Sequence, residues 1–334
     1  IMITGSHNPK EYNGFKITIK KDSFFGKDLQ ILKDRVNEII ASGEQIADDE
    51  SCEKFNILEK YVEFFVKEFS ELKNFKKPFV IDCANGAVGV SLVPIVKALG
   101  LNAKILYEDP DGNFPNHHPD PSEKENLKEI FSLIEKKEFD LGFGFDGDGD
   151  RVLAVDAKGN IVDGDKIMFI LAKHLKEQGE LKDNMVVSTV MSNIGFYKAV
   201  EENGLQSVKT AVGDRYVVEE MRKNDYSLGG EQSGHIVLMN YATTGDGILT
   251  AVKLANIIKT SGKSLEELAS EVSIYPQKLV NIKVVDKKTA MEDAEILAEC
   301  EKVEKELEGN GRILLRASGT ENLIRVMVEA SSDE

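Results

Sequence analysis

The regular alternation of short apolar runs with amphipathic segments constrains the fold of this chain most. From Lys54 onward, runs of strand length alternate with segments that have helical periodicity. The first series predicts strands at 78–82, 102–106 and 140–145, and helices at 55–69, 91–99 and 124–137. The second predicts strands at 152–156, 185–189 and 206–210, and helices at 164–178, 194–203, 214–224, 246–260 and 265–272. Such alternation is typical of βαβ units around a parallel sheet.

The two ends of the chain differ from this pattern. The start offers one short strand at 15–20 and one helix at 27–41, too little to bury a core alone, so we expect a domain whose beginning is cut. The last part predicts a strand at 277–286, a helix at 287–308 and two further strands, which is an α+β unit with an antiparallel sheet that is also incomplete. The predicted fold class is α/β, with tandem α/β domains and a C-terminal α+β domain. The expected domains are 1–50, 51–155, 156–273 and 274–334.

Charge and cysteine content narrow the range of partners. The chain has 42 basic and 58 acidic residues, a net charge of −16, which argues against a nucleic-acid or anionic membrane partner because both need a basic face. No apolar run reaches the roughly 20 residues of a membrane-spanning helix. Cys52, Cys83 and Cys300 are widely spaced and indicate neither a zinc site nor a disulfide framework, and free thiols fit a cytoplasmic protein.

The stretch FDGDGDR places Asp146, Asp148 and Asp150 directly after an apolar run. Three carboxylates so close repel one another unless a cation compensates them, and hard oxygen ligands select Mg²⁺ or Ca²⁺. An EF-hand would need Gly where Arg151 stands and Glu where Ala157 stands, which argues against a calcium-binding structural protein. The stretch therefore predicts a site in which Mg²⁺ has room for an oxygen from another group, often a phosphate.

Two further stretches offer groups that suit a phosphorylated sugar. The sequence GGEQSGH, between two short apolar strands, fits either a polyhydroxylated ligand or a polar hairpin, and it offers Glu231, Ser233 and His235. The sequence RASGTENLIR follows a strand and fits either a phosphate nest with guanidinium groups beside it or a plain turn. Its candidate phosphate-binding residues are Arg316, Ser318, Gly319, Thr320 and Arg325.

The stretch TGSHNP near the start places Ser6 on a glycine-containing corner. Ser6 lacks the G-x-S-x-G setting of a hydrolase nucleophile, and an isolated serine is often only a turn residue. A serine that carries phosphate gains a charge of about −1.5 to −2, so it needs cations nearby, and His7, Lys16 and Arg151 are the candidates. With the carboxylates and Mg²⁺, this set indicates phosphoryl transfer by positioning and electrostatics.

The stretches TGSHNP, DGDGDR, GEQSGH and RASGTE occur in the order found in the α-D-phosphohexomutases, and the chain resembles that family over its whole length. The resemblance implies four domains around a central cleft, each contributing one loop. It implies that Ser6 is a phosphoserine that gives and retakes the phosphoryl group, and that Asp146, Asp148 and Asp150 hold Mg²⁺ with the Ser6 phosphate. It also implies a bisphosphorylated sugar intermediate, a phosphosugar substrate and a sugar bisphosphate as activator.

The same resemblance assigns roles to the other candidates. His7, Lys16 and Arg151 would act beside Ser6, and Lys16 is a candidate for proton transfer or charge stabilisation. Sugar hydroxyls would be bound by Glu231 and Ser233, with His235 in the same loop. The phosphate that is not transferred would be gripped by Arg316, Ser318, Gly319, Thr320 and Arg325. Asn322 departs from the family, which commonly has Pro at this position, and this alters turn stiffness more than chemistry.

The two halves of the chain resemble different branches of the family. TGSHNPKEYNGFKI and DGNFPNHHPDP resemble phosphomannomutase/phosphoglucomutase, whereas STVMSNIGF, AVGDRYVVEEM and GGEQSGH resemble phosphoglucosamine mutase. We favour conversion of glucosamine-6-phosphate to glucosamine-1-phosphate, with neutral hexose phosphates as the alternative. Asp214 is either a partner for the 2-ammonium group or a helix cap, and Arg215 beside it is a further substrate-binding candidate. A hybrid chain would give the same mosaic, and a fragment that binds phosphosugar and Mg²⁺ without turnover is the alternative of another class.

Other conspicuous residues have simpler interpretations. His117 and His118 lie in a proline-rich loop, where we expect a surface or hinge role rather than metal binding. His174 lies on a predicted helix and is expected at the surface or in packing. The turn at 191–193 is expected to shape its domain rather than to contact substrate.

Overall fold

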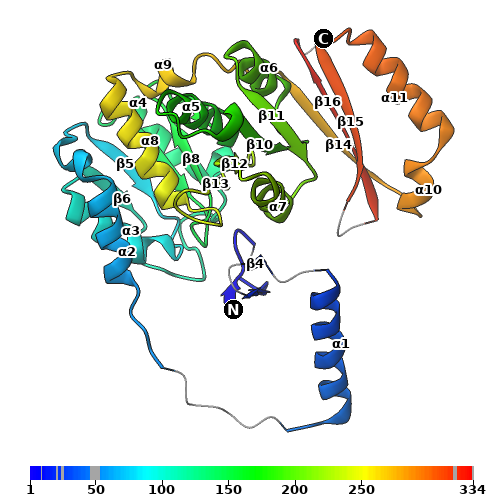
Figure 1. The fold of residues 1–334 in the computed structure, drawn as a ribbon, viewed down its shortest axis with the longest axis horizontal. Coiled ribbons are helices and arrows are strands. Elements are labelled where there is room, and N and C mark those ends of the chain that lie inside the picture. The colour runs from blue at the N-terminus through cyan, green and yellow to red at the C-terminus, as the bar shows by residue number, and fades with distance from the viewer. Residues whose placement is uncertain (9, 20–21, 24–25, 46–52, 319–321, 333–334) are drawn as a thin grey trace.

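The computed structural model describes residues 1–334 apart from 9, 20–21, 24–25, 46–52, 319–321 and 333–334. Two α/β units form the body of the molecule, with a C-terminal sheet at one flank and an N-terminal hairpin below them in this view (Figure 1). The architecture confirms the predicted α/β fold class with a C-terminal α+β unit. Within the described ranges, no helix has both the length and the apolar character needed to cross a membrane.

The first α/β unit is built on a five-stranded sheet in the order β6-β5-β7-β8-β9. Its strands are β5 (Phe79–Asp82), β6 (Ala103–Leu106), β7 (Gly142–Phe145), β8 (Val152–Val155) and β9 (Ile161–Val162), and its helices are α2 (Leu58–Glu68), α3 (Val88–Leu99) and α4 (Lys128–Glu135). β5 runs parallel to β6 and β7, whereas β7, β8 and β9 are antiparallel in succession. The β7–β8 loop therefore lies at the carboxyl end of β7, the edge where ligands bind in such sheets.

The second unit is built on a four-stranded sheet in the order β11-β10-β12-β13. Its strands are β10 (Met185–Thr189), β11 (Gln206–Thr210), β12 (Leu228–Gly230) and β13 (Ile236–Leu238), and its helices are α5 (Gly164–Glu177), α6 (Ile194–Glu202), α7 (Asp214–Asn224), α8 (Gly247–Ser261) and α9 (Leu265–Ala269). β10 pairs in parallel with β11 and β12, and β13 returns antiparallel to β12. The GGEQSGH stretch thus forms the turn of a β12–β13 hairpin.

One hydrophobic core continues through both units. Phe143 of the first sheet and Phe169 and Phe196 of the second unit are all fully buried in one cluster of contacting side chains. Helix α8 packs against both β8 of the first sheet and β13 of the second. Because each buried large apolar side chain contributes about 1.5–3 kcal/mol, this shared core fixes the β7–β8 loop relative to the β12–β13 turn.

The C-terminal sheet has the order β14-β16-β15 and is entirely antiparallel. Its strands are β14 (Gln277–Lys283), β15 (Gly311–Ala317) and β16 (Leu323–Ala330), and its helices are α10 (Lys287–Met291) and α11 (Ala294–Glu306). The single helix expected at 287–308 is wrong. The chain breaks before α11 because the Asp293 side chain accepts the N–H groups of Glu295 and Ile296 at 2.9 and 3.1 Å and caps a new helix.

The N-terminal segment forms two small hairpins and one separate helix. β1 (Met2–Thr4) pairs with β2 (Gly14–Lys16), and β3 (Thr18–Ile19) pairs with β4 (Asp22–Ser23). The strand expected at 15–20 is therefore wrong as one element, because its described residues are divided between β2 and β3, and Lys20 lies outside the described residues. Helix α1 (Lys27–Ser42) buries none of its residues and stands away from the body (Figure 1).

Smaller differences from expectation lie at element boundaries. The helix expected at 124–137 begins as a 3-10 turn, η2 (Lys124–Leu127), before α4. Two further 3-10 turns, η1 (Ser70–Asn74) and η3 (Lys182–Asn184), precede β5 and β10. Such ends are set by local capping and packing, which a periodicity argument does not resolve.

Candidate active site

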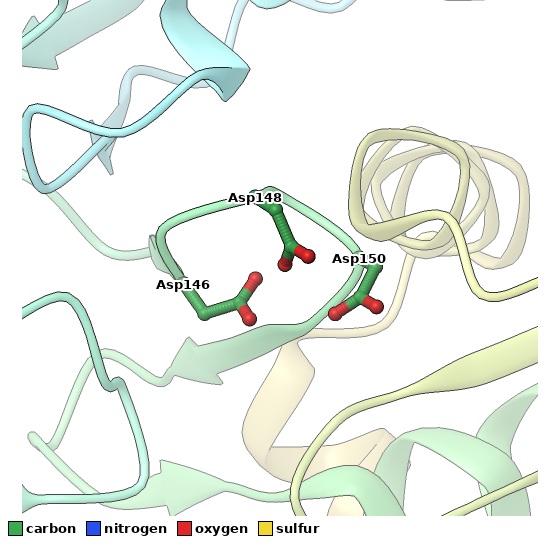
Figure 2. A group of neighbouring side chains, drawn as sticks. All are labelled: Asp146, Asp148 and Asp150. Carbon is green, nitrogen blue, oxygen red and sulfur yellow. The ribbon is translucent and has the colours of Figure 1, made fainter. Parts of the chain in front are cut away.

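Three carboxylates converge in the loop between β7 and β8, which we call the carboxylate loop (residues 146–151). Figure 2 shows Asp146, Asp148 and Asp150 turned toward the interior of this loop. Each offers an oxygen that lies within 4.8 Å of the corresponding oxygens of the other two. Burial, together with the charges of Asp150 and Asp148, raises the pKa of Asp146 to about 8. The loop therefore carries more negative charge than its surroundings compensate.

Backbone contacts from two other turns hold the carboxylate loop in place. The N–H of Ala87 donates to the carbonyl of Gly147 at 2.9 Å, and the N–H of Gly247 donates to the carbonyl of Gly149 at 3.0 Å. A Cβ on Gly86 would lie 2.6 Å from the Gly147 carbonyl oxygen, so only glycine permits this approach. The turn at residues 83–89, which follows β5, and the start of α8 thus form a fixed support for the loop.

The β1–β2 hairpin brings Ser6 onto the carboxylate loop. Ser6 Oγ lies 3.5 Å from Asp146 Oδ2 and 3.1 Å from His7 Nδ1. Ser6 has φ of 50°, a left-handed conformation that is costly for a residue with a side chain and that clusters at functional sites. A Cβ on Gly147 would lie 2.3 Å from the Ser6 carbonyl oxygen, so glycine at 147 allows the two loops to meet.

Thr4 was missed by sequence reasoning although it begins the TGSHNP stretch. Its Oγ1 donates to Asp148 Oδ2 at 2.9 Å and accepts the N–H of Ser6, also at 2.9 Å. A single hydroxyl therefore orients both the serine turn and one carboxylate. The signal available in the sequence was its position two residues before Ser6 on the same corner.

Cations from distant segments partly balance the carboxylates. Lys16 Nζ lies 3.3 Å from Asp148 Oδ2 and 2.9 Å from Asp150 Oδ2, and Arg151 Nε lies 4.0 Å from Asp150 Oδ1. Burial alone would raise the pKa of Asp150, but the hydrogen bond from His235 and the charge of Lys16 outweigh it and hold that pKa well below its usual range. Burial alone would lower the pKa of Lys16, but Asp150 and Asp148 raise it, so Lys16 is protonated at neutral pH.

His7 differs from Lys16 in its charge. Burial and the neighbouring charge of Arg151 lower the pKa of His7, so its ring is neutral at pH 7. Its Nδ1 can therefore exchange a proton with the Ser6 hydroxyl across their 3.1 Å contact. The structure thus brings Ser6, His7, Lys16 and Arg151 together around the carboxylate loop.

The oxygen atoms of the carboxylate loop fit a divalent cation. Asp148 Oδ1 and Asp150 Oδ1 are buried and have no hydrogen-bond partner, which is costly unless a ligand completes them. Mg²⁺ prefers oxygen ligands, and carboxylate oxygens whose negative charge is only partly balanced by nearby cations are suitable ligands for it. Asp146, Asp148 and Asp150 are therefore the residues that would hold this ion.

The β12–β13 turn, which we call the sugar-side turn (residues 231–235), lies beside the carboxylate loop. His235 Nδ1 lies 3.4 Å from Asp150 Oδ2, and His235 Nε2 accepts the N–H of Gly245 at 3.2 Å. Because Nε2 is an acceptor, the ring proton is on Nδ1 and is directed at Asp150. Both ring nitrogens of this buried histidine are thus engaged within the protein. Ser233 is half-buried in the same turn.

A cavity of about 870 Å³ opens next to the carboxylate loop. Among its lining residues are Lys16, Asp148, Asp150, Asp214 and Arg215. The N-cap of α7 is Gly213, so Asp214 is not the helix cap. Glu231 Oε1 accepts the N–H of Gly213 at 3.0 Å and thereby ties the sugar-side turn to the segment that presents Asp214.

The C-terminal sheet presents an arginine pair, Arg316 on β15 and Arg325 on β16. The two residues are direct cross-strand partners, so two like charges face each other. Burial and the charge of Arg325 lower the pKa of Arg316, and buried Arg325 Nε has no hydrogen-bond partner among the described residues. Such a pair is completed by an anion. Among the described residues, no hydrogen bond or ion pair links it to the carboxylate loop.

The remaining candidates of the phosphate nest are only partly described. Ser318 is buried, and its carbonyl accepts Lys287 Nζ at 2.8 Å. Gly319 and Thr320 lie outside the described residues. Of the other conspicuous histidines, His117 has its Nε2 3.1 Å from buried Asp82, and His174 is half-buried on α5.

Comparison of the sequence with known proteins shows which family the chain matches. Four domain descriptions match in chain order: "Phosphoglucomutase/phosphomannomutase, alpha/beta/alpha domain I" over residues 1–45, domain II over 59–159, domain III over 163–275 and the C-terminal domain over 279–334. A phosphoglucosamine mutase of Geobacillus kaustophilus is 46% identical over 345 residues, covering 100% of this chain and 75% of that protein. One of Bacillus cereus is 47% identical over 346 residues, again covering 100% and 75%.

Solved structures agree with this fold. A phosphoglucomutase/phosphomannomutase family protein from Burkholderia thailandensis has a TM-score of 0.80 at 26% identity, covering 99% of this chain and 72% of that chain. An N-acetylphosphoglucosamine mutase from Aspergillus fumigatus, solved with GlcNAc-6P and magnesium, has a TM-score of 0.74 at 19% identity, covering 99% and 85%. The second likeness concerns the fold alone.

Proposed function

Since the chain belongs to the phosphoglucomutase/phosphomannomutase family and is a phosphohexomutase, we propose that it interconverts glucosamine-6-phosphate and glucosamine-1-phosphate. The observation that carries the proposal is the 3.5 Å approach of Ser6 Oγ to Asp146 within the carboxylate loop. A hydroxyl so placed can carry a phosphoryl group beside a divalent ion and the charge of Lys16. Binding of a phosphosugar without turnover would not require the Ser6 hydroxyl to lie beside the carboxylate loop.

The reaction consists of two phosphoryl transfers. Phosphorylated Ser6 gives its phosphoryl group to the free hydroxyl of the sugar phosphate, forming a sugar bisphosphate and freeing the Ser6 hydroxyl. The bisphosphate turns in the cavity, and its other phosphate returns to Ser6. An added sugar bisphosphate activates the enzyme in this scheme because it can phosphorylate Ser6. When bound by the three carboxylates, Mg²⁺ supplies electrostatic stabilisation of the transferring group.

Neighbouring side chains divide the remaining work. Neutral His7 exchanges the proton of the Ser6 hydroxyl, across 3.1 Å. Lys16 is held protonated by Asp148 and Asp150, which supports charge stabilisation rather than proton transfer as its role. Arg316 and Arg325, with Ser318, Gly319 and Thr320, would grip the phosphate that is not being transferred. In this scheme the segments 1–50, 51–155, 156–273 and 274–334 each contribute one loop.

The amino sugar is supported by a carboxylate in the cavity. Asp214 lines the cavity and does not serve as the cap of α7, so it is a candidate partner for a 2-ammonium group. Arg215, Glu231 and Ser233 would contact the other polar groups of the sugar. Relatives that are 44–47% identical are named phosphoglucosamine mutases, which supports the same substrate.

Rates on three substrates test this assignment. Glucosamine-6-phosphate, glucose-1-phosphate and mannose-1-phosphate are compared with Mg²⁺ and a trace of the matching sugar bisphosphate. We expect the highest kcat/KM on the amino sugar, and we expect Asp214→Asn to lower it about tenfold, the loss of roughly 1.4 kcal/mol from a charge-assisted bond, without affecting the neutral sugars. Equal rates on the neutral sugars with none on the amino sugar would contradict the proposal.

A further inference from the structure

A buried polar cluster lies where the C-terminal sheet meets the second α/β unit. Glu329 on β16 is fully buried, and its Oε2 accepts hydrogen bonds from the N–H of Ile194 at 3.0 Å and from Arg312 Nε at 2.7 Å. Arg312 Nη2 donates to the carbonyl of Ser192 at 2.6 Å. One ion pair of the C-terminal sheet is thereby bound to the start of α6.

Asn193 extends this cluster toward α5. Its Nδ2 donates to Glu329 Oε1 at 3.4 Å, and its backbone N–H donates to Asp165 Oδ2 at 2.7 Å. Its Oδ1 accepts the N–H of Tyr275 at 3.0 Å, on the segment that leads into β14. We call Asp165, Asn193, Arg312 and Glu329 the junction cluster. The turn at 191–193 therefore does more than shape its own unit, because it connects that unit to the C-terminal sheet.

The junction cluster contains two buried carboxyl groups but one guanidinium. Glu329 Oε2 lies 2.7 Å from Arg312 Nε, so the partly exposed guanidinium has Glu329 as its counter-charge. Asp165 is fully buried, accepts a neutral backbone N–H and leaves Oδ1 without a hydrogen-bond partner. Burial and the charge of Asp163 raise the pKa of Asp165 well above its usual range. Asp165 is thus the neutral member of the cluster and Glu329 the charged one.

Asp165 lies in the first turn of α5, on which the sugar-side turn rests. The N–H of Gly164 donates to the carbonyl of Gln232 at 2.9 Å, and a Cβ on Gly164 would lie 2.0 Å from the Glu231 carbonyl oxygen. Asp163 Oδ2 is 3.5 Å from Gln232 Nε2. The sugar-side turn and the junction cluster are therefore attached to neighbouring residues of one helix start.

Glu329 also shares a strand face with the arginine pair. Side chains alternate along a strand, so Glu329 and Arg325, four residues apart on β16, point to the same face. The register pairs Glu329 with Arg312 and Arg325 with Arg316. One face of the sheet thus carries the junction ion pair at one end and the arginine pair about 13 Å away, at roughly 3.3 Å per residue.

We propose that Glu329 is a positioning residue that holds the arginine pair at a fixed place relative to the sugar-side turn, with Asp165 as the uncharged acid of the same cluster. The connection runs from the turn through α5, Asn193 and Glu329 into β16. It rests on the proposed function, because it takes the two ends of the connection to bind the same phosphosugar. Glu329 does not touch the reacting atoms, so its effect is exerted through the groups it places.

Two isosteric substitutions separate the roles of the two acids. Glu329→Gln leaves Arg312 without its counter-charge, so kcat/KM on glucosamine-6-phosphate is expected to fall about 10- to 100-fold, mainly through a higher KM. Asp165→Asn replaces a neutral carboxyl by an amide whose oxygen still accepts the Asn193 N–H, so kcat and KM should stay close to those of the unaltered enzyme. Equal losses in the two variants would overturn the assignment of charge within the cluster.

A paired substitution keeps the test valid if Glu329→Gln unfolds the sheet. Arg312→Met with Glu329→Met removes both charges and fills the space with apolar atoms, which is commonly tolerated by the fold. We expect a cooperative thermal transition together with the raised KM. The matched control is Glu304→Gln, because Glu304 contacts β15 through the N–H of Ile313 at 3.0 Å but lies outside the junction. It should leave KM unchanged.

A double-mutant cycle with the arginine pair distinguishes positioning from a general loss of stability. If Glu329 acts by placing Arg325, then Arg325→Met alone and Arg325→Met with Glu329→Gln should have nearly the same KM. Additive defects in KM would overturn the proposal, as would an unchanged KM in both Glu329→Gln and the paired Met variant. An unaltered enzyme that turns over none of the hexose phosphates would instead overturn the proposed function.

Discussion

The carboxylate loop and the arginine pair have opposite charges and are held in place differently. The loop gathers three acids and receives Lys16 and His235 from distant segments, yet two of its carboxylate oxygens accept no hydrogen bond from any described residue. The arginine pair sets two guanidinium groups across a strand pair and leaves Arg325 Nε unpartnered. Each region is thus incomplete by itself, and under the proposed function each would be completed by a ligand of opposite sign, a metal ion in one case and a phosphate in the other.

The mechanical support of the two regions also differs. The carboxylate loop is fixed by backbone hydrogen bonds from Ala87 and Gly247 and by the close contact of Gly147 with Ser6. The arginine pair lies near the end of a hairpin whose link to the second unit is at the opposite end, at Glu329. Chemistry should therefore depend sharply on the loop, whereas the arginine pair should mainly govern binding.

Removing Ser6 should have the largest effect of any single change. Ser6→Ala deletes the oxygen that carries the phosphoryl group, so we expect kcat to fall by roughly 10⁴-fold or more, which is about 5.4 kcal/mol of barrier. Equilibrium binding of the phosphosugar, measured by calorimetry, should be retained because the arginine pair is intact. Undiminished turnover would contradict a role of Ser6 in the reaction, and its strained backbone would then have no functional explanation.

A carboxylate substitution should follow in magnitude. Asp148→Asn removes one ionic ligand and weakens the contacts with Thr4 and Lys16, so we expect kcat/KM to fall about 10²- to 10³-fold at fixed Mg²⁺. Part of this loss should be recovered at higher Mg²⁺, and a Mg²⁺ titration of activity measures both. Asp140→Asn, at an exposed acid just before β7, is the matched control and should leave the titration unchanged.

Changing the arginine pair should affect binding more than chemistry. Arg325→Met removes one of two facing guanidinium groups, and we expect KM to rise about 10- to 100-fold with a smaller fall in kcat, the loss of a charge-assisted contact. Since the pair is self-repelling, the same variant should unfold at an equal or higher temperature without ligand. A large fall in kcat with KM unchanged would contradict the assignment of chemistry to the carboxylate loop and of substrate binding to the arginine pair.

The sequence predicted the chemical content of both regions better than their geometry. Alternation of apolar runs and helical segments, together with four ordered stretches, was sufficient for the fold class and for Ser6, Lys16 and the three aspartates as neighbours. It missed Thr4, whose hydroxyl is one among many in the chain, and the junction ion pair, because Arg312 and Glu329 meet only through strand register. It also assigned one helix where Asp293 begins a second, since capping competes locally with periodicity.

The smallest expected effect concerns a residue that belongs to neither region. Asp293→Ala removes the cap of α11, and we expect a loss of about 1 kcal/mol in the free energy of unfolding, measured by urea titration. Because α11 packs against β15 and not against the carboxylate loop, kcat should stay the same. If KM nevertheless rose, the arginine pair would be sensitive to the packing behind its strand as well as to Glu329. An unchanged KM together with the expected loss of stability would indicate that the position of the arginine pair is set at the end of β16 that carries Glu329.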